Sequence, residues 1–159
     1  MIDPKSFWRA LGERPLGVTL VTARGAAGPA GFLGLSASHV SADPPSLMVS
    51  IDDRTSALKV MLEARHFAVS CLPAEAAALV DIFGGKTELK GTERFKEGDW
   101  TSLSSGAPVL KCAPAAFDCT LETTLAYAAT TIMVGRVIDL SVTGGDPLLY
   151  FRGQYQPLK

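Results

Sequence analysis

The sequence predicts a mainly β fold, an antiparallel barrel with helices packed at its openings. Segments typical of strands outnumber helical segments, and most follow one another without a helical crossover. Gly135 interrupts one long strand segment, as expected at a bend or bulge that closes a barrel. A length of 159 residues suits one domain with a sizeable core. We therefore expect one domain over residues 1–159 and no doubly wound parallel sheet.

The N-terminal segment predicts a helix followed by a hairpin. Asp3 is a suitable N-cap, Pro4 occupies the first helical position, and apolar residues recur at helical spacing up to Gly12. We expect this short helix to dock on the barrel. Residues 15–23 and 30–35 are β-rich on either side of a Gly/Pro turn, which predicts a hairpin.

The middle of the chain predicts strands that alternate with helices. Pro44 and Pro45 exclude a helix and lead into a strand over residues 47–51. Residues 56–64 are strong helix formers, and a β-rich run follows over residues 66–72. Residues 73–83 open with proline, are rich in alanine and end at two glycines, so they predict another helix.

The last third returns to strands after a polar segment. Residues 86–106 contain Phe95 and Trp100 as their large anchors and are expected to form an ordered surface loop. Strands are then predicted over residues 115–126, 131–142 and 148–151.

Composition excludes several classes of protein. The net charge of −1, without a cluster of Lys and Arg, predicts no nucleic-acid partner. Three cysteines without CxxC spacing are expected to be free thiols in a reducing cytoplasm. No apolar run approaches the length of a membrane span, so we expect a cytoplasmic protein without membrane contact.

Motifs of the common nucleotide-binding and hydrolytic enzymes are absent. The sequence has no GxGxxG after a strand, no GxxxxGK[ST], no HExxH and no GxSxG. Two histidines, His39 and His66, are too few for a His-based metal site, so no metal is expected. His39 lies in a serine-rich bend, where it either faces a pocket or satisfies a turn.

The segment from Gly28 to Ser56 predicts one wall of a ligand pocket. Its small residues would let a flat ligand approach the main chain closely: Gly31, Gly34, Ser36, Ala37 and Ser38. Its last residues, Arg54, Thr55 and Ser56, precede a helix, and their amides, hydroxyls and guanidinium would suit a phosphate. A capped helix with a solvated arginine explains the same residues equally well.

The order of these segments resembles the short-chain flavin reductase family, FMN-binding split barrels that include the reductase components of two-component flavin-dependent monooxygenases. The matching segments are residues 15–22, 28–32 with 40–45, 67–72, 94–95 with 99–100, 106–110, 132–137 and 147–155. The resemblance implies a homodimer of six-stranded antiparallel split β-barrels. It implies an NAD(P)H-dependent flavin reductase that uses NADH or NADPH and supplies reduced FMN or FAD to a partner oxygenase.

The resemblance also implies the residues that contact the flavin. The ring edge would meet main chain and the Ser36 hydroxyl, and the phosphate would meet Thr55, Ser56 and the helix start. The implied cofactor residues are Leu33, Gly34, Leu35, Ser36, Ser50, Ile51, Asp52, Arg54, Thr55, Ser56, Phe83 and Gly84. Because the cofactor supplies the chemistry, no titrating triad is required, which accounts for the missing motifs.

The sequence departs from the family pattern in two places. The family's Gly-Asp-His, whose imidazole helps to hold the nicotinamide, is Ala128-Ala129-Thr130 here, and its Thr-Ala-Ser-Ser is Leu-Gly-Leu-Ser at residues 33–36. Thr130 and Tyr155 are then the candidates on the nicotinamide side. Two alternatives follow: a flavin-binding electron-transfer or carrier protein with little NAD(P)H turnover, and a split-barrel oxidase acting on a small substrate.

Overall fold

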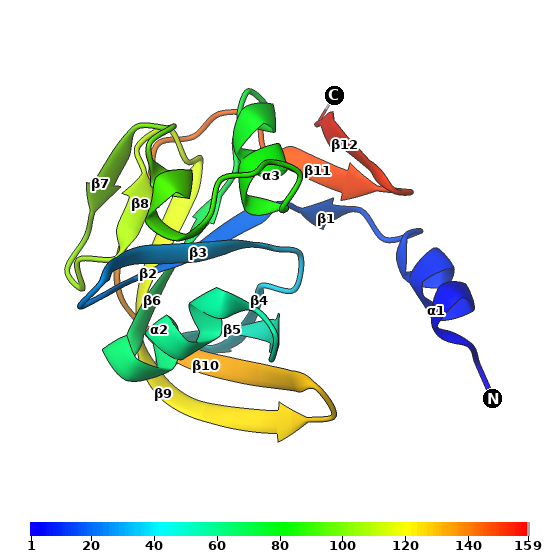
Figure 1. The fold of residues 1–159 in the computed structure, drawn as a ribbon, viewed down its shortest axis with the longest axis horizontal. Helices are drawn as coiled ribbons and strands as arrows, with labels where there is room; N and C mark the ends of the chain where they lie inside the picture. Colours follow the sequence, from blue (N-terminus) through cyan, green and yellow to red (C-terminus); the bar gives the residue numbers. More distant parts are fainter. Residues whose placement is uncertain (159) are drawn as a thin grey trace.

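The computed structural model describes residues 1–158, which are mainly β with helices around antiparallel sheets (Figure 1). The helices are α1 (Pro4–Leu11), α2 (Ser56–Ala64), α3 (Ala77–Phe83) and the 3-10 helix η1 (Gly91–Phe95). The predicted fold class, mainly β with flanking helices, is confirmed.

A seven-stranded antiparallel sheet forms the body of the protein. In spatial order its strands are β3 (Gly28–Gly34), β2 (Thr19–Gly25), β6 (His66–Cys71), β9 (Ala115–Tyr127), β10 (Thr130–Val142), β5 (Pro45–Asp52) and β4 (Ser38–Ala42). Two smaller sheets hold β1 (Leu16–Gly17), β11 (Leu148–Phe151) and β12 (Gln154–Pro157), and β7 (Trp100–Ser102) with β8 (Pro108–Leu110). The predicted hairpin is thus β2–β3, and the strands predicted at β5, β6, β9, β10 and β11 are also confirmed.

The predicted six-stranded barrel is not confirmed, because the main sheet has one more strand and is not closed by hydrogen bonds. Strand β5 pairs with β10 on one side and with β4 on the other. No edge of β5 is therefore left for β3, although the two strands come into contact. The serine-rich bend expected near His39 is strand β4, which forms because it pairs with β5.

Other differences also come from pairing between distant segments. Strands β7, β8 and β12 were not predicted, and β7 and η1 lie within the expected surface loop. Helix α3 begins at Ala77 and not at Pro73, because Pro73 forms an isolated bridge with Pro147. The Ala74 N–H also donates to the Asp146 carbonyl at 2.9 Å, which holds this segment against the β11 side of the fold.

Alternating side chains on the central strands build two cores on opposite faces of the sheet. Val21 on β2 and Phe67 on β6 belong to the core that α2 completes, whereas their neighbours Leu20 and Ala68 belong to the core that α3 completes. All four side chains are fully buried. Figure 1 shows α2 and α3 on the two sides of β3.

The predicted irregularity at Gly135 is confirmed. The pairing of β9 with β10 shifts register between Val134 and Gly135. A Cβ added to Gly135 would lie 2.5 Å from Phe67 Cζ and 2.7 Å from Cys119 Cβ. Glycine is required here because the strand passes directly over the Phe67 ring.

Helix α1 begins as predicted but does not dock through its apolar face. Asp3 Oδ1 accepts a hydrogen bond from the Ser6 N–H at 3.0 Å, and Pro4 opens the helix. None of its residues is buried, and Phe7 and Trp8 keep 55% and 65% of their surface exposed. Figure 1 shows α1 apart from the main sheet. The expectation that α1 docks on the barrel is therefore wrong for a single copy of the chain.

No helix within residues 1–158 has the length and apolar character needed to cross a membrane.

Candidate functional site

The larger of two adjoining cavities lies between the end of β3, strand β5, helix α1 and the turn between β11 and β12. Its volume is about 980 Å³, within the range typical of small-molecule sites. Its lining residues are Trp8, Arg9, Leu11, Gly12, Glu13, Leu16, Phe32, Leu33, Gly34, Leu35, Ser36, Ser50, Ile51, Asp52, Thr55, Thr130, Tyr150, Arg152 and Gly153. Most of the wall is apolar, with hydroxyls and main-chain groups at one side.

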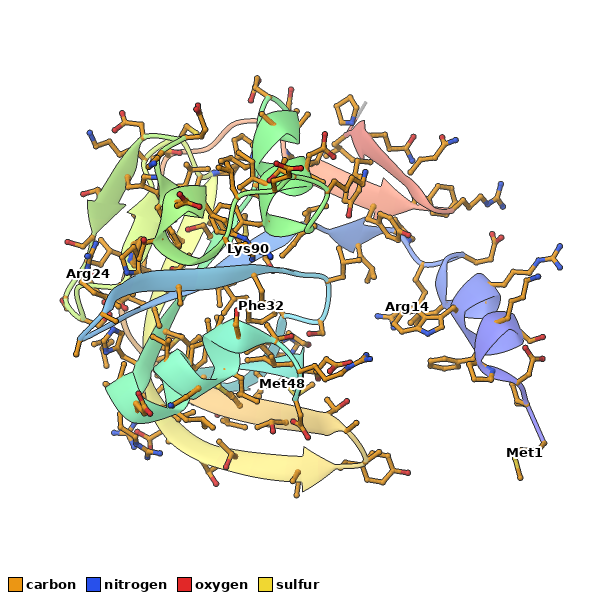
Figure 2. All side chains as sticks on the ribbon, in the orientation of Figure 1. Met1, Arg14, Arg24, Phe32, Met48 and Lys90 are labelled. Atoms are coloured by element: carbon orange, nitrogen blue, oxygen red, sulfur yellow. The ribbon has the colours of Figure 1, made fainter. Side chains whose placement is uncertain are left out.

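The smaller cavity lies between the start of α2, the end of α3, η1 and β12. Its volume is about 530 Å³, and it is lined by Phe32, Leu33, Arg54, Thr55, Ser56, Phe83, Gly84, Gly85, Arg94 and Tyr155. Phe32, Leu33 and Thr55 line both cavities, so the two adjoin along β3. Figure 2 labels Phe32 on β3, where its ring packs against the core that α2 completes.

Every residue that the sequence analysis assigned to the cofactor lines one of these cavities. Leu33 to Ser36, Ser50 to Asp52 and Thr55 line the larger one, and Arg54 to Ser56 with Phe83 and Gly84 line the smaller one. Thr130 lies on the wall of the larger cavity and Tyr155 on that of the smaller one. His39 is exposed on β4 and lines neither of them.

Ser36 joins the two strands that form the polar side of the larger cavity. Its hydroxyl donates to the Ser50 carbonyl at 3.1 Å and accepts from the Ser50 N–H at 3.0 Å. These two hydrogen bonds link the chain that leaves β3 to strand β5, with which β3 shares no ladder. The Ser36 hydroxyl therefore already has partners within the protein.

Arg54 is held by Asp52. The Arg54 Nε and Nη2 donate to the two Asp52 carboxylate oxygens at 2.9 and 2.8 Å, and the Arg54 N–H donates to Asp52 Oδ1 at 2.9 Å. These hydrogen bonds lower the pKa of Asp52 to about 2 and raise the pKa of Arg54. The expected phosphate-binding guanidinium is thus already paired, with 89% of its side chain exposed.

Polar groups at the start of α2 are available to bind a ligand. Thr55 is the N-cap residue, yet its hydroxyl makes no capping hydrogen bond. The Leu58 N–H donates to the Thr55 carbonyl at 3.0 Å, whereas the first two amides of a helix have no partner within it. The loop before α2 is held by strand β10, because the Thr131 hydroxyl donates to Asp53 Oδ1 at 2.7 Å. A fixed loop therefore presents free amides and two hydroxyls to the smaller cavity, as an anion site requires.

Two glycines in the predicted wall serve packing within the protein. A Cβ on Gly31 would lie 3.0 Å from the Val21 carbonyl oxygen and 3.2 Å from Phe95 Cζ. A Cβ on Gly34 would lie 3.1 Å from a Val21 methyl and 3.2 Å from the Thr19 hydroxyl. Both missing side chains point toward β2 and its neighbours, so close packing within the protein is sufficient to explain both glycines.

Several residues of the two cavities were missed because they come from distant parts of the chain. Arg94 reaches the smaller cavity from η1, and Trp8 reaches the larger one from α1. Arg152 comes from the β11–β12 turn, and its Nε and Nη2 donate to Glu13 Oε2 at 2.9 and 2.7 Å. No local pattern in the sequence signals these approaches.

Tyr155 and Tyr150 form a pair beside the smaller cavity, with ring centroids 5.0 Å apart. Burial raises the pKa of Tyr155, with the neighbouring Tyr150 adding to this effect and Lys86 opposing it. Lys86 Nζ lies 6.0 Å from the Tyr155 ring centroid. Tyr155 is therefore a neutral phenol near neutral pH and can donate a hydrogen bond.

Comparison with known proteins finds one family over most of the chain. Residues 11–159 match the flavin reductase like domain. An FMN reductase (NADH), RutF, of Agrobacterium fabrum is 36% identical over 153 residues, which cover 96% of this chain and 87% of that protein.

Solved structures agree with the sequence match. The NADH:FAD oxidoreductase SgcE6 of Streptomyces globisporus C-1027 superposes with a TM-score of 0.89 at 27% identity, covering 100% of this chain and 97% of that one. BorF, the flavin reductase component of a bacterial two-component tryptophan halogenase, gives a TM-score of 0.90 at 27% identity, covering 98% of each chain.

Proposed function

The chain belongs to the flavin reductase like domain family, and we propose that it is an NADH-dependent flavin reductase that supplies reduced FMN or FAD to a separate oxygenase. Its relatives include an FMN reductase (NADH) and an NADH:FAD oxidoreductase. A neighbouring structure is the reductase component of a two-component halogenase, which supports a separate partner that consumes the reduced flavin.

One observation carries this proposal for the chain's own residues. Two adjoining cavities, one mainly apolar and one with the start of a helix and two hydroxyls on its wall, match the isoalloxazine ring and the phosphate end of a flavin. An isoalloxazine ring needs a broad apolar wall with a few polar main-chain groups, and a ribityl phosphate needs hydrogen-bond donors. The residues present therefore fit a flavin.

We assign the ring to the larger cavity. Leu33 and Leu35 would pack against its faces, and main-chain groups between Leu33 and Ser36 would meet its edge. Ser50 and Ile51 on β5 form the opposite part of this wall. The chemistry that a bound flavin supplies is acceptance of a hydride from NADH, and the protein's part is to bind and orient both reactants.

We assign the phosphate end to the smaller cavity. Thr55 and Ser56 would donate their hydroxyls there, together with the first amides of α2. Phe83 and Gly84 at the end of α3 form the facing wall. Thr130, on the wall of the larger cavity, would lie toward the nicotinamide, in place of the imidazole that the family resemblance implies. Tyr155, the other candidate, lines the smaller cavity and would lie beside the phosphate end.

We further propose that residues 1–159 act as one flavin-binding domain of split-barrel type within a cytoplasmic homodimer. The open edges of the seven-stranded sheet at β3 and β4, with β3 in contact with β5, support the split-barrel description. Exposed apolar side chains support a second copy as the partner, namely Phe7 and Trp8 on α1 and Leu125, Leu140 and Val142 on β9 and β10. Free cysteines are consistent with a reducing compartment.

The purified protein can be tested by following NADH absorbance with and without added FMN or FAD. Flavin-dependent loss of NADH is the expected result. Bound flavin without loss of NADH would instead favour the carrier alternative. Failure to bind either flavin, or to consume NADH with either one present, would contradict the proposal.

A further inference from the structure

We infer that Arg94, and not Arg54, is the guanidinium that binds the phosphate group of the flavin, and this inference rests on the proposed function. Both arginines line the smaller cavity beside Thr55 and Ser56. They differ in their hydrogen-bond partners within the protein: Arg54 binds a carboxylate, and Arg94 binds one main-chain carbonyl. This difference decides which arginine can bind a phosphate.

Arg54 has its charge and two of its five side-chain N–H donors committed to Asp52. Two of its nitrogens bind the two carboxylate oxygens in a bidentate pair, and its main-chain N–H binds the same carboxylate. A phosphate approaching Arg54 would also approach the Asp52 carboxylate, which repels it. Breaking the pair would cost part of the energy gained from the new contact.

Arg94 is free of any such partner. Its Nε donates to the Leu89 carbonyl at 3.1 Å, which fixes the plane of the guanidinium. No carboxylate within residues 1–158 forms an ion pair with it, and the residue is half-buried. A guanidinium has five N–H donors, so four remain for a ligand in a planar fork that suits two phosphate oxygens.

The segment that carries Arg94 is held rigidly. The neighbouring Phe95 ring lies 5.1 Å from Phe83 and 5.0 Å from Trp100 between centroids. Phe95 also packs so closely over Gly31 on β3 that a Cβ there would approach within 3.2 Å of its ring. The position of Arg94 is therefore set before a ligand arrives, which lowers the entropy lost on binding.

The ligand chemistry that this arrangement recognises is a phosphate ester on a flavin. FMN and FAD carry one, whereas riboflavin has the same ring system without any phosphate. Riboflavin is thus a probe for the ring site alone, and the ratio of FMN to riboflavin affinity reports on the phosphate contact.

The experiment compares Arg94→Gln with the matched control Arg54→Gln, by titrating each protein with FMN and with riboflavin and measuring Kd from flavin fluorescence. Arg94→Gln is expected to raise the Kd for FMN about tenfold or more, as for loss of charge-assisted hydrogen bonds, and to change the Kd for riboflavin by less than about twofold. Arg54→Gln is expected to change both by less than about twofold. Arg94→Lys should recover part of the loss, because it keeps the charge but not the fork.

Wild-type affinity for FMN in Arg94→Gln would overturn the inference, as would an equal loss of riboflavin binding, which would mean that Arg94 only shapes the cavity. A larger effect from Arg54→Gln would overturn it as well. Unchanged riboflavin binding shows that the variant is folded. If the wild-type protein bound neither flavin, the proposed function itself would fail, which is a distinct result.

Discussion

The Ser36 hydroxyl makes two hydrogen bonds with the main chain of Ser50, donating to its carbonyl and accepting from its N–H. This contact joins the end of β3 to β5 at the place where the sheet has no ladder between them. One side chain thus links two strands that share no backbone pairing, at the wall of the larger cavity.

Ser36→Ala is therefore expected to lower the free energy of unfolding by about 1–3 kcal/mol, because both half-buried main-chain groups of Ser50 lose their partner. Urea denaturation measures this change. Ser38→Ala is the matched control, since its hydroxyl makes a single exposed contact of 3.5 Å, and it should be nearly neutral. Equal stability of the two variants would contradict the role given to Ser36.

Local patterns were enough to predict the central strands and the hairpin β2–β3, because their β-rich runs alternate between two buried faces. They were not enough for β4, β7, β8 and β12, whose residues become strands only by pairing with distant segments. The same limit applies to the cavities. Asp52 and Arg54 are only two residues apart, yet their pairing was not predicted, and Arg94 is positioned by the packing of Phe95 on Phe83.

Gly135→Ala is expected to be strongly destabilising. Its Cβ would lie 2.5 Å from Phe67 Cζ, and that ring is fully buried with no room to move. Overpacking of this kind costs about 1–3 kcal/mol. Thermal or urea unfolding measures it against Gly17→Ala, where a Cβ meets nothing within 4 Å.

Phe67→Leu in the Gly135→Ala background should recover part of this loss, because it removes the ring atoms that the new methyl meets. Independent, additive losses in the double variant would show that the clash is not the cause.

The pairing of Asp52 with Arg54 predicts a pH dependence at low pH. The folded-state pKa of about 2 lies below the usual value of 3.8, so the stabilisation is present above the unfolded pKa and is lost as the pH falls toward 2. An NMR titration of the Asp52 carboxyl carbon measures this pKa directly. Arg54→Gln should raise it toward 3.8 without restoring it fully, because the main-chain N–H of residue 54 still donates to Asp52, and a wild-type midpoint already near 3.8 would contradict the pairing.

Ala128 occupies the first position of the two-residue turn between β9 and β10 with φ of 51°, a conformation that favours glycine. Ala128→Gly is expected to raise the free energy of unfolding by about 1 kcal/mol by relieving this strain. Ala129→Gly in the same turn has no positive φ to relieve and should not stabilise the protein. If both changes had the same effect on urea unfolding, the strain at Ala128 would not be real.

Thr130 directly follows that turn, pairs in register with Asp52 on β5 and lines the larger cavity. The family resemblance implies an imidazole at this position, so Thr130→His places a second donor or acceptor on the nicotinamide side of the proposed site. We expect kcat/KM for NADH to rise about tenfold, the equivalent of one additional hydrogen bond of ~1.4 kcal/mol, with FMN affinity unchanged. Thr130→Phe, which adds a ring without nitrogen, should give no increase and separates hydrogen bonding from bulk. A Thr130→His variant no faster than the parent would remove this position from the binding of NADH.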